Sequence, residues 1–372
     1  MRPSLSGTQR LVVKLGTNLL TGGSASFRDQ IAINLVEQID ALRQKNIQVI
    51  LVSSGAIGLG ARKLRITGRI SQVAMRQACA AVGQPLLMQQ YNQLFEKYDT
   101  STAQVLLTRE LLNHRESFLN IQATIEHLLQ MNIVPICNEN DSVSIAEIGP
   151  VFGDNDNLSA HIASKLDADL LVLLTDIDAL YTADPKKDKN AQAVRLVKKI
   201  TPDLLKTASG SGSESGTGGM RTKLEAVQTA ARAGTHVVIA DGSQPDILLR
   251  MIKDEEVGTL FLSGPRLKSR HRWILNSAPK GSITVDQGAE KALCDGKSLL
   301  PKGVTAVKGS FHSGDVIAIN DRFHAISRLD SSQIQKIMGV HSKEAAKILG
   351  CDTDVVAQAE DIVIKKPIED EG

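Results

Sequence analysis

The sequence has no run of apolar residues long enough to cross a membrane. The nearest candidate, residues 170–174, has the length of a buried strand. Near the N-terminus there is only a short apolar run, which Lys14 interrupts, so we expect no signal peptide. These absences predict a cytoplasmic protein that does not insert into a membrane.

Cysteine is scarce and scattered. The four cysteines, Cys79, Cys137, Cys294 and Cys351, lie far apart and form no CxxC pair. This spacing argues against a disulfide framework and against a zinc site, and it fits a reducing compartment. Positive and negative side chains nearly balance, with 43 Lys and Arg against 41 Asp and Glu, so no strong polyanion partner is indicated overall.

Two common nucleotide-binding motifs are also absent. In SSGAIGLGAR, residues 53–62, the glycines follow the order GxxGxG, which weakens a dehydrogenase interpretation because dinucleotide sites use GxGxxG. The single GKS sequence, residues 296–298, has Lys291 in place of the first glycine of a Walker loop and predicts a surface turn. The glycines of residues 53–62 still suit an anion, because backbone amides at a strand-to-helix turn point toward it.

The sequence does contain alternating helices and strands. Helices are expected at residues 29–45, 71–98 and 110–130, the second being interrupted at Gly83-Gln84-Pro85. Short apolar segments typical of buried strands lie around them: 11–16, 47–52, 103–108, 133–137, 169–175 and 236–240. This order predicts parallel βαβ units, whose ligands bind beyond the carboxyl ends of the strands.

A dense polar group occurs in VFGDNDNLSAHIASKL, residues 151–166, where Asp154, Asn155 and Asp156 are consecutive. The apolar positions that follow recur at helical spacing and predict a helix that starts near Asn157. Capping that helix needs only one short polar side chain. The other groups must be solvated, paired with cations or used on a ligand.

Polar residues also follow other strands at the same edge of the sheet. The sequence NEND, residues 138–141, comes after the strand at 133–137, and two such acidic clusters are more than capping requires. Asp176 follows the strand at 169–175 and is compatible with a turn residue as well as with a functional one.

Three cationic residues stand where charge is unfavourable. Lys14 lies near the carboxyl end of the first strand, where it either protects a sheet edge or requires an anion. Ser54 closes the second strand and is expected to face the same crevice. In GTGGMRTKLEA, residues 216–226, Arg221 and Lys223 lie in the first turns of an amphipathic helix, where they oppose its dipole unless a phosphate joins them.

The composition changes after residue 263. We predict a first domain over residues 8–263, a basic linker over 264–280, a compact and mostly β domain over 281–362, and a disordered charged tail over 363–372. Between residues 264 and 350 there are 14 Lys and Arg against 7 Asp and Glu, a bias that permits contact with nucleic acid. Aromatic residues are sparse there, which disfavours base stacking.

Six motifs resemble, in their order along the chain, those of the glutamate 5-kinases in the amino acid kinase family: VVKLGTNLLTGG, SSGAIGLG, NENDSVSIAEI, FGDNDNLSA, LLTDIDALYTADP and GTGGMRTKLEA. The segment LLPKGVTAVKGSFHSGDVI resembles a PUA domain. The loop IGPVFGD is slightly longer than usual, and the acidic tail is not a family feature. The resemblance implies an α/β fold, an open and mainly parallel αβα sandwich, followed by a small PUA-like domain.

The same resemblance implies an activity and its residues. ATP with Mg²⁺ would phosphorylate the side-chain carboxylate of L-glutamate, the first step of proline biosynthesis. Lys14 and Lys223 would neutralise the transferring phosphoryl group, and Asp156 would hold both lysines. The residues implied to bind glutamate are Ser54, Asp141, Asn155, Asn138 and Asp154. Those implied to bind the nucleotide are Lys14, Thr175, Asp176, Thr217, Gly218, Gly219, Met220, Arg221, Thr222 and Lys223.

Several partners and alternatives follow. The resemblance implies inhibition by proline, a dimer or tetramer of this chain, and functional coupling to glutamyl phosphate reductase. A related kinase for acetylglutamate, aspartate or carbamate is an alternative. The free α-amine distinguishes glutamate from acetylglutamate as a substrate, because acetylglutamate lacks the charge with which Asp141 could pair. An RNA-binding protein that uses the PUA-like domain is a second alternative, but it leaves both acidic clusters unexplained.

Overall fold

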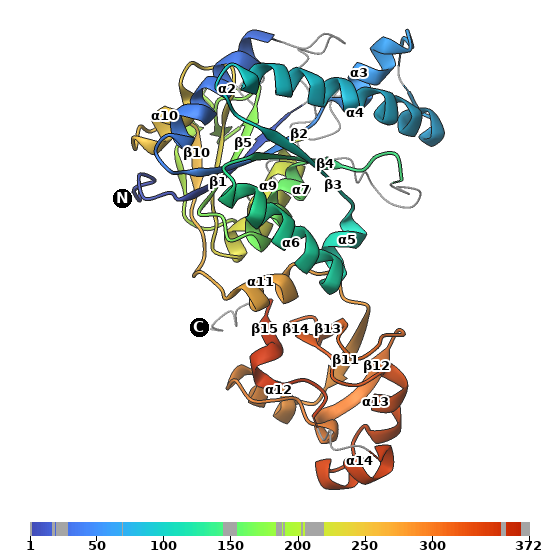
Figure 1. The fold of residues 1–372 in the computed structure, drawn as a ribbon. Coiled ribbons are helices and arrows are strands. Elements are labelled where there is room, and N and C mark those ends of the chain that lie inside the picture. The colour runs from blue at the N-terminus through green and yellow to red at the C-terminus, as the bar shows by residue number, and fades with distance from the viewer. Residues whose placement is uncertain are drawn as a thin grey trace. The chain divides into compact units, whose positions relative to one another are not determined.

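The computed structural model describes residues 2–16, 19, 29–68, 70–143, 155–183, 188, 190–201, 204, 219–350 and 355–365. The chain divides into two compact units, Met1–Arg266 and Leu267–Gly372 (Figure 1). The range predicted as a linker contains helix α11 (Ser269–Leu275), and the domain boundaries drawn from the sequence stay predictions. Within the described residues, no helix combines the length and the apolar character that a membrane crossing requires.

The first unit is built on an eight-stranded sheet in the order β3-β4-β2-β1-β5-β9-β10-β8. All neighbouring strands are parallel except β10, which pairs antiparallel with β9. The strands are β1 (Arg10–Leu15), β2 (Gln48–Ser53), β3 (Thr102–Leu107), β4 (Val134–Glu139), β5 (Leu170–Thr175), β8 (Leu196–Val197), β9 (His236–Asp241) and β10 (Thr259–Phe261). This confirms the predicted mainly parallel α/β fold and places β1 between β2 and β5, so Lys14 does not protect a sheet edge.

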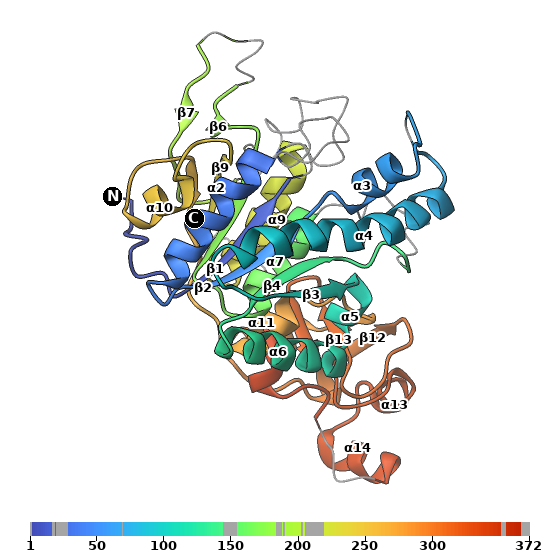
Figure 2. The ribbon, with the colours of Figure 1, turned by 45° about the horizontal axis from the view of Figure 1, so that its top comes forward.

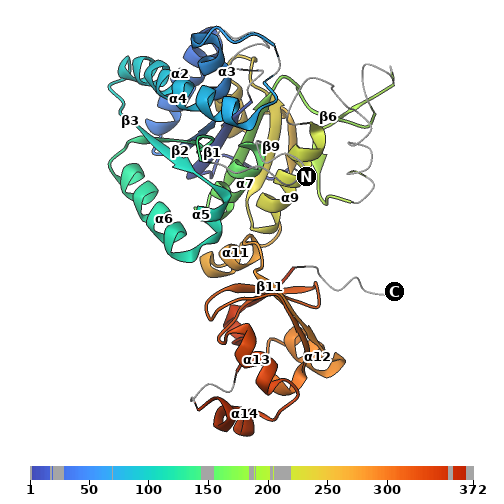
Figure 3. The same cartoon turned by 90° about the vertical axis from the view of Figure 1, so that its right-hand side faces the viewer.

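Helices cover both faces of this sheet, as Figures 2 and 3 show. One face carries α2 (Asp29–Arg43), α3 (Ala56–Lys63), α4 (Val73–Glu96) and α10 (Ile247–Ile252). The other face carries α5 (Arg109–Asn113), α6 (Arg115–Gln130), α7 (Asn155–Lys165) and α9 (Met220–Arg232). A short antiparallel pair, β6 (Leu180–Tyr181) and β7 (Ala193–Val194), follows β5.

The alternation of β1 assigns its residues to these two faces. Leu11 and Val13 belong to the core under α2 and α4, whereas Val12 belongs to the core under α7 and α9. Because side chains alternate along a strand, Lys14 lies on the same face as Val12. This register brings its ammonium group to α7 and α9.

The predicted interruption of α4 is wrong, because the helix continues through Pro85. Its packing on α3 explains this continuity: a Cβ on Gly83 would lie 1.7 Å from the carbonyl oxygen of Ala56, and one on Gly60 would lie 1.8 Å from that of Cys79. The two helix backbones therefore touch. This close packing outweighs the helix hydrogen bond that proline removes.

Two other helix boundaries differ from the prediction. Helix α7 is already helical at Asn155, so Asp156 lies in its first turn and does not precede it. The helix predicted over residues 110–130 is divided at His114, whose backbone is extended at φ −83° and ψ 121°. Thr108 caps α5 and the His114 side chain caps α6, and these local hydrogen bonds favour two helix starts.

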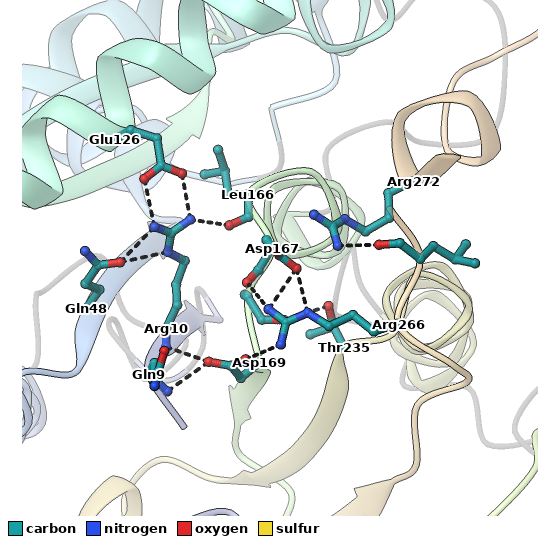
Figure 4. Close-up of polar contacts among 12 residues, drawn as sticks. Gln9, Arg10, Gln48, Glu126, Leu166, Asp167, Asp169, Thr235, Arg266 and Arg272 are labelled. Atoms are coloured by element: carbon teal, nitrogen blue, oxygen red, sulfur yellow. Dashed lines mark hydrogen bonds and ion pairs between the residues drawn. The ribbon is translucent and has the colours of Figure 1, made fainter. Parts of the chain in front are cut away.

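The amino-terminal ends of the strands are tied together by charged side chains, as Figure 4 shows. Arg10 donates to Gln48 at 2.8 and 2.9 Å and forms an ion pair with Glu126 at 2.7 Å. Asp169 accepts from the Arg10 backbone nitrogen at 2.9 Å and pairs with Arg266 at 2.9 Å. These bonds fix β1 against β2 and β5 at the end opposite to the carboxyl ends of the strands.

The second unit contains a five-stranded sheet in the order β12-β11-β13-β14-β15. Its strands are β11 (Gly281–Val285), β12 (Val304–Lys308), β13 (Val316–Ile319), β14 (Phe323–Ile326) and β15 (Ile362–Ile364). Its helices are α11, α12 (Gln287–Cys294), α13 (Ser331–Ile337) and α14 (Ser342–Leu349), with one-turn helices at Pro301–Gly303 and Ala359–Asp361. One apolar core, which includes Phe311 and Phe323, joins the sheet to α12, α13 and α14.

Candidate active site

The centre of the site is the carboxylate of Asp156. Lys14 of β1 lies 2.5 Å from its Oδ1, and Lys223 of α9 lies 3.0 Å from its Oδ2. Figures 1 and 3 show α7 and α9 side by side on one face of the sheet, which is why Lys223 reaches the first turn of α7. The structure thus brings together three residues that are far apart in sequence.

All three charged side chains of this group are buried. The side chain of Asp156 is fully buried, and Lys14 and Lys223 are 5% and 7% exposed. Burial alone would raise the pKa of Asp156, but the two ammonium groups outweigh it and lower that pKa to about 2. The anion that offsets both lysines in the protein itself is therefore Asp156.

A chain of amides begins one residue earlier, at Asn155. Its Nδ2 donates to the Ser53 carbonyl oxygen at 3.1 Å, to Ser54 Oγ at 2.8 Å and to Asn138 Oδ1 at 2.9 Å. Three of the residues predicted to bind glutamate therefore lie in one hydrogen-bonded group at the carboxyl ends of β2 and β4. A ligand held by these amides would lie beside the lysines.

This chain continues to Gln84, a residue that was not predicted to belong to the site. Asn138 Nδ2 donates to Gln84 Oε1 at 2.8 Å, and Gln84 is only 8% exposed. Gln84 comes from α4, where the predicted helix break concealed its place in a continuous helix. The sequence signal that could have drawn attention to it is a glutamine at helical spacing from apolar residues such as Ala80 and Leu87.

Asp141 lies at the same edge, after β4. Burial and the nearby carboxylate of Glu139 raise its pKa to about 6, although Arg76 acts in the opposite direction. A carboxyl with this pKa is mostly ionised at pH 7. It can therefore bind an ammonium group while remaining sensitive to mild acid.

Besides Lys14, the described residues predicted to bind the nucleotide lie at the end of β5 and at the start of α9. Thr175 ends β5 and donates to Asp176 Oδ1 at 2.9 Å. Helix α9 starts after Gly219 without a side-chain cap, and its first residues are Met220, Arg221 and Thr222. Arg221 forms an exposed pair with Glu225, so it does not join Lys223 at Asp156. The remaining predicted residues, Asp154, Thr217 and Gly218, lie outside the described residues.

The chain is similar to proteins of known family. Residues 9–241 match the amino acid kinase family, and residues 281–349 match the PUA domain. A glutamate 5-kinase from Photorhabdus laumondii is 44% identical over 97% of this chain and 99% of its own length. The chain belongs to the glutamate 5-kinase family.

Other relatives cover the chain to a similar extent. The glutamate 5-kinase of Proteus mirabilis is 45% identical over 97% of this chain and 100% of its own length. Among solved structures, the UMP kinase from Bacillus anthracis matches with a TM-score of 0.49 and 16% identity, covering 72% of this chain and 99% of that one.

Proposed function

We propose that this protein transfers the γ-phosphoryl group of ATP to the side-chain carboxylate of L-glutamate, which gives L-glutamyl 5-phosphate and ADP. The observation that carries this proposal is the convergence of Lys14 and Lys223 on Asp156, directly beside the amide group of Asn155. Two cations at one point suit a transferring phosphoryl group. The neighbouring amides and Asp141 suit a zwitterionic amino acid.

The lysines supply the charge that phosphoryl transfer needs. In the reaction, an oxygen of the glutamate side-chain carboxylate forms a bond to the γ-phosphorus while the bond from that phosphorus to the ADP oxygen breaks. Negative charge on the phosphoryl oxygens is stabilised by ammonium groups that are already in place. Asp156 keeps Lys14 and Lys223 within 3.0 Å of itself, so neither has to be reorganised during the reaction.

The acceptor requires positioning and no general base, because a carboxylate is already ionised at neutral pH. Asn155, Asn138 and Ser54 offer amide and hydroxyl groups, and Asp141 offers a charge for the α-ammonium group. Binding at these groups would direct the side-chain carboxylate toward the lysines. Their contribution is mainly to proximity and orientation.

The residues present fit ATP and Mg²⁺. Helix α9 starts after Gly219, which has no side chain to cap it, so its first backbone amides suit phosphate oxygens, and Lys223 follows one turn later. The described part of the chain contains no group of three or more His, Cys, Asp or Glu side chains that could hold a metal ion. Mg²⁺ bound to ATP keeps phosphate and water ligands and supplies further positive charge at the phosphoryl group.

An ADP-release assay with a panel of acids tests the proposal. We expect turnover with L-glutamate and ATP-Mg²⁺, with the acyl phosphate trapped by hydroxylamine as the hydroxamate. N-acetylglutamate should be a poor substrate because it lacks the charge that Asp141 binds. Turnover with acetylglutamate, aspartate or carbamate in place of glutamate would contradict the proposal and favour another specificity within the family.

The relatives' name also supports finer proposals. The product would enter proline biosynthesis, and proline would inhibit by competing with glutamate at an overlapping site. We further propose a dimer or tetramer of this chain and coupling to glutamyl phosphate reductase, which would limit hydrolysis of the acyl phosphate. Unchanged rates at low glutamate and saturating proline would exclude this control, and light scattering would give the number of chains.

A further inference from the structure

Gln84 is the end of the amide chain that starts at Asn155. Its Oε1 accepts from Asn138 Nδ2 at 2.8 Å, and its Nε2 is buried without a hydrogen-bond partner among the described residues. The same helix sends Tyr91, two turns later, to Ser53 at 2.8 Å. Helix α4 therefore reaches the carboxyl ends of β2 and β4 through two polar side chains.

Backbone groups fix the orientation of each amide in the chain. Asn138 Oδ1 accepts from the Glu139 backbone nitrogen at 2.9 Å, so its Nδ2 must face Gln84. Asn155 Nδ2 faces the Ser53 carbonyl oxygen, which can only accept. Since Gln84 must present Oε1 to Asn138, its Nε2 necessarily faces away from that partner.

The unpartnered donor shows that Gln84 does not serve packing alone. A buried donor without an acceptor is destabilising, and a methionine of similar length would fill the same space without one. What glutamine adds is the acceptor for Asn138. A local cost of this kind is expected where a residue is retained for a functional site.

We propose that Gln84 is a positioning residue for glutamate: its Oε1 holds the Asn138 amide, which in turn holds Asn155 and thereby the substrate. This inference rests on the proposed function. Its action is indirect, because Gln84 reaches the substrate-side residues only through Asn138. The nucleotide side lies at the end of β5 and the start of α9, outside this amide chain.

The first test is Gln84→Met in the full chain. The KM for glutamate should rise roughly tenfold, as expected for one lost hydrogen bond, while the KM for ATP stays within about twofold. The melting temperature should change little, because Asn138 Nδ2 loses its acceptor but the unpartnered Nε2 is removed. Leu87→Met, three residues further along the same buried helix face, is the matched control and should leave both KM values unchanged.

A double-mutant cycle with Asn138→Ala separates positioning from a general structural role. If Gln84 acts through Asn138, adding Gln84→Met to Asn138→Ala should change the KM for glutamate by less than about twofold. The inference would be overturned if the two substitutions multiplied each other's effect on the KM for glutamate, or if Gln84→Met alone changed that KM by less than about twofold. An equal rise in the KM values for glutamate and ATP, together with a lower melting temperature, would also overturn it. If the unmodified protein did not phosphorylate glutamate, the proposed function itself would fail instead.

Discussion

Removing the charge of Lys223 is the most direct test of the site. Lys223→Met keeps the apolar stem of the side chain and deletes the ammonium group that lies 3.0 Å from Asp156 Oδ2. If this group stabilises charge that develops on the phosphoryl oxygens, its loss should cost about 3 to 4 kcal/mol in the transition state. That figure corresponds to a fall in kcat of roughly two to three orders of magnitude.

The structure also predicts the effect on stability. Asp156 is fully buried and would keep its ion pair with Lys14 at 2.5 Å. Breaking one half of a buried ion-pair group should therefore destabilise the fold by about 1 to 3 kcal/mol, less than the loss of a sole partner. The variant should remain folded at 25 °C, which allows kcat to be measured on intact protein.

The assay is ADP release at saturating glutamate and ATP-Mg²⁺, with circular dichroism melting on the same samples. Lys223→Arg should recover little activity, because a planar guanidinium cannot take the place of a compact ammonium group. Arg232→Met, at an exposed position in the last turn of the same helix, is the matched control for charge and should keep kcat within a few-fold. A kcat for Lys223→Met within a few-fold of the unmodified protein would refute the mechanism.

Four further outcomes are expected. For Asp141, whose pKa is raised to about 6 by burial and Glu139, kcat/KM for glutamate should fall about tenfold per pH unit below pH 6, and Asp141→Asn should remove that dependence. Asn155→Ala should raise the KM for glutamate far more than the KM for ATP, and equal rises would contradict its assignment. Burial and Arg115 lower the pKa of Lys165 in the folded protein from 10.5 to about 7. Between these two pH values the unfolded chain binds one more proton than the folded protein, so the free energy of unfolding should rise with pH across this range. Lys165→Met should remove this slope and raise the melting temperature at pH 6, and an unchanged slope in denaturant titrations would show that the ammonium group is solvated. Gly83→Ala should destabilise the protein by roughly 2 kcal/mol or more, because its Cβ would meet the Ala56 carbonyl oxygen, and wild-type melting would show that the two helices can separate at little cost.

Much of the site follows from local sequence combined with one rule about sheets. The apolar segments predict parallel strands, and residues at their carboxyl ends meet at one edge. From the sequence alone, that reasoning places Lys14, Ser54 and the cluster at residues 138–141 at the same edge, and the fold confirms the parallel arrangement. The strand order could not be read from the sequence, because pairing depends on contacts between distant segments.

Tertiary structure alone decided what those residues do to one another. Asp156 lies between Lys14 and Lys223 because the alternation of β1 and the packing of α7 on α9 bring three distant segments together. Propensity predicted a break at Pro85, but the contact of two glycine-containing helices keeps α4 continuous and delivers Gln84 to Asn138. Burial, hydrogen-bond partners and pKa are properties of the packed chain, so the sequence could name candidate groups, whereas only the fold could set their charge and orientation.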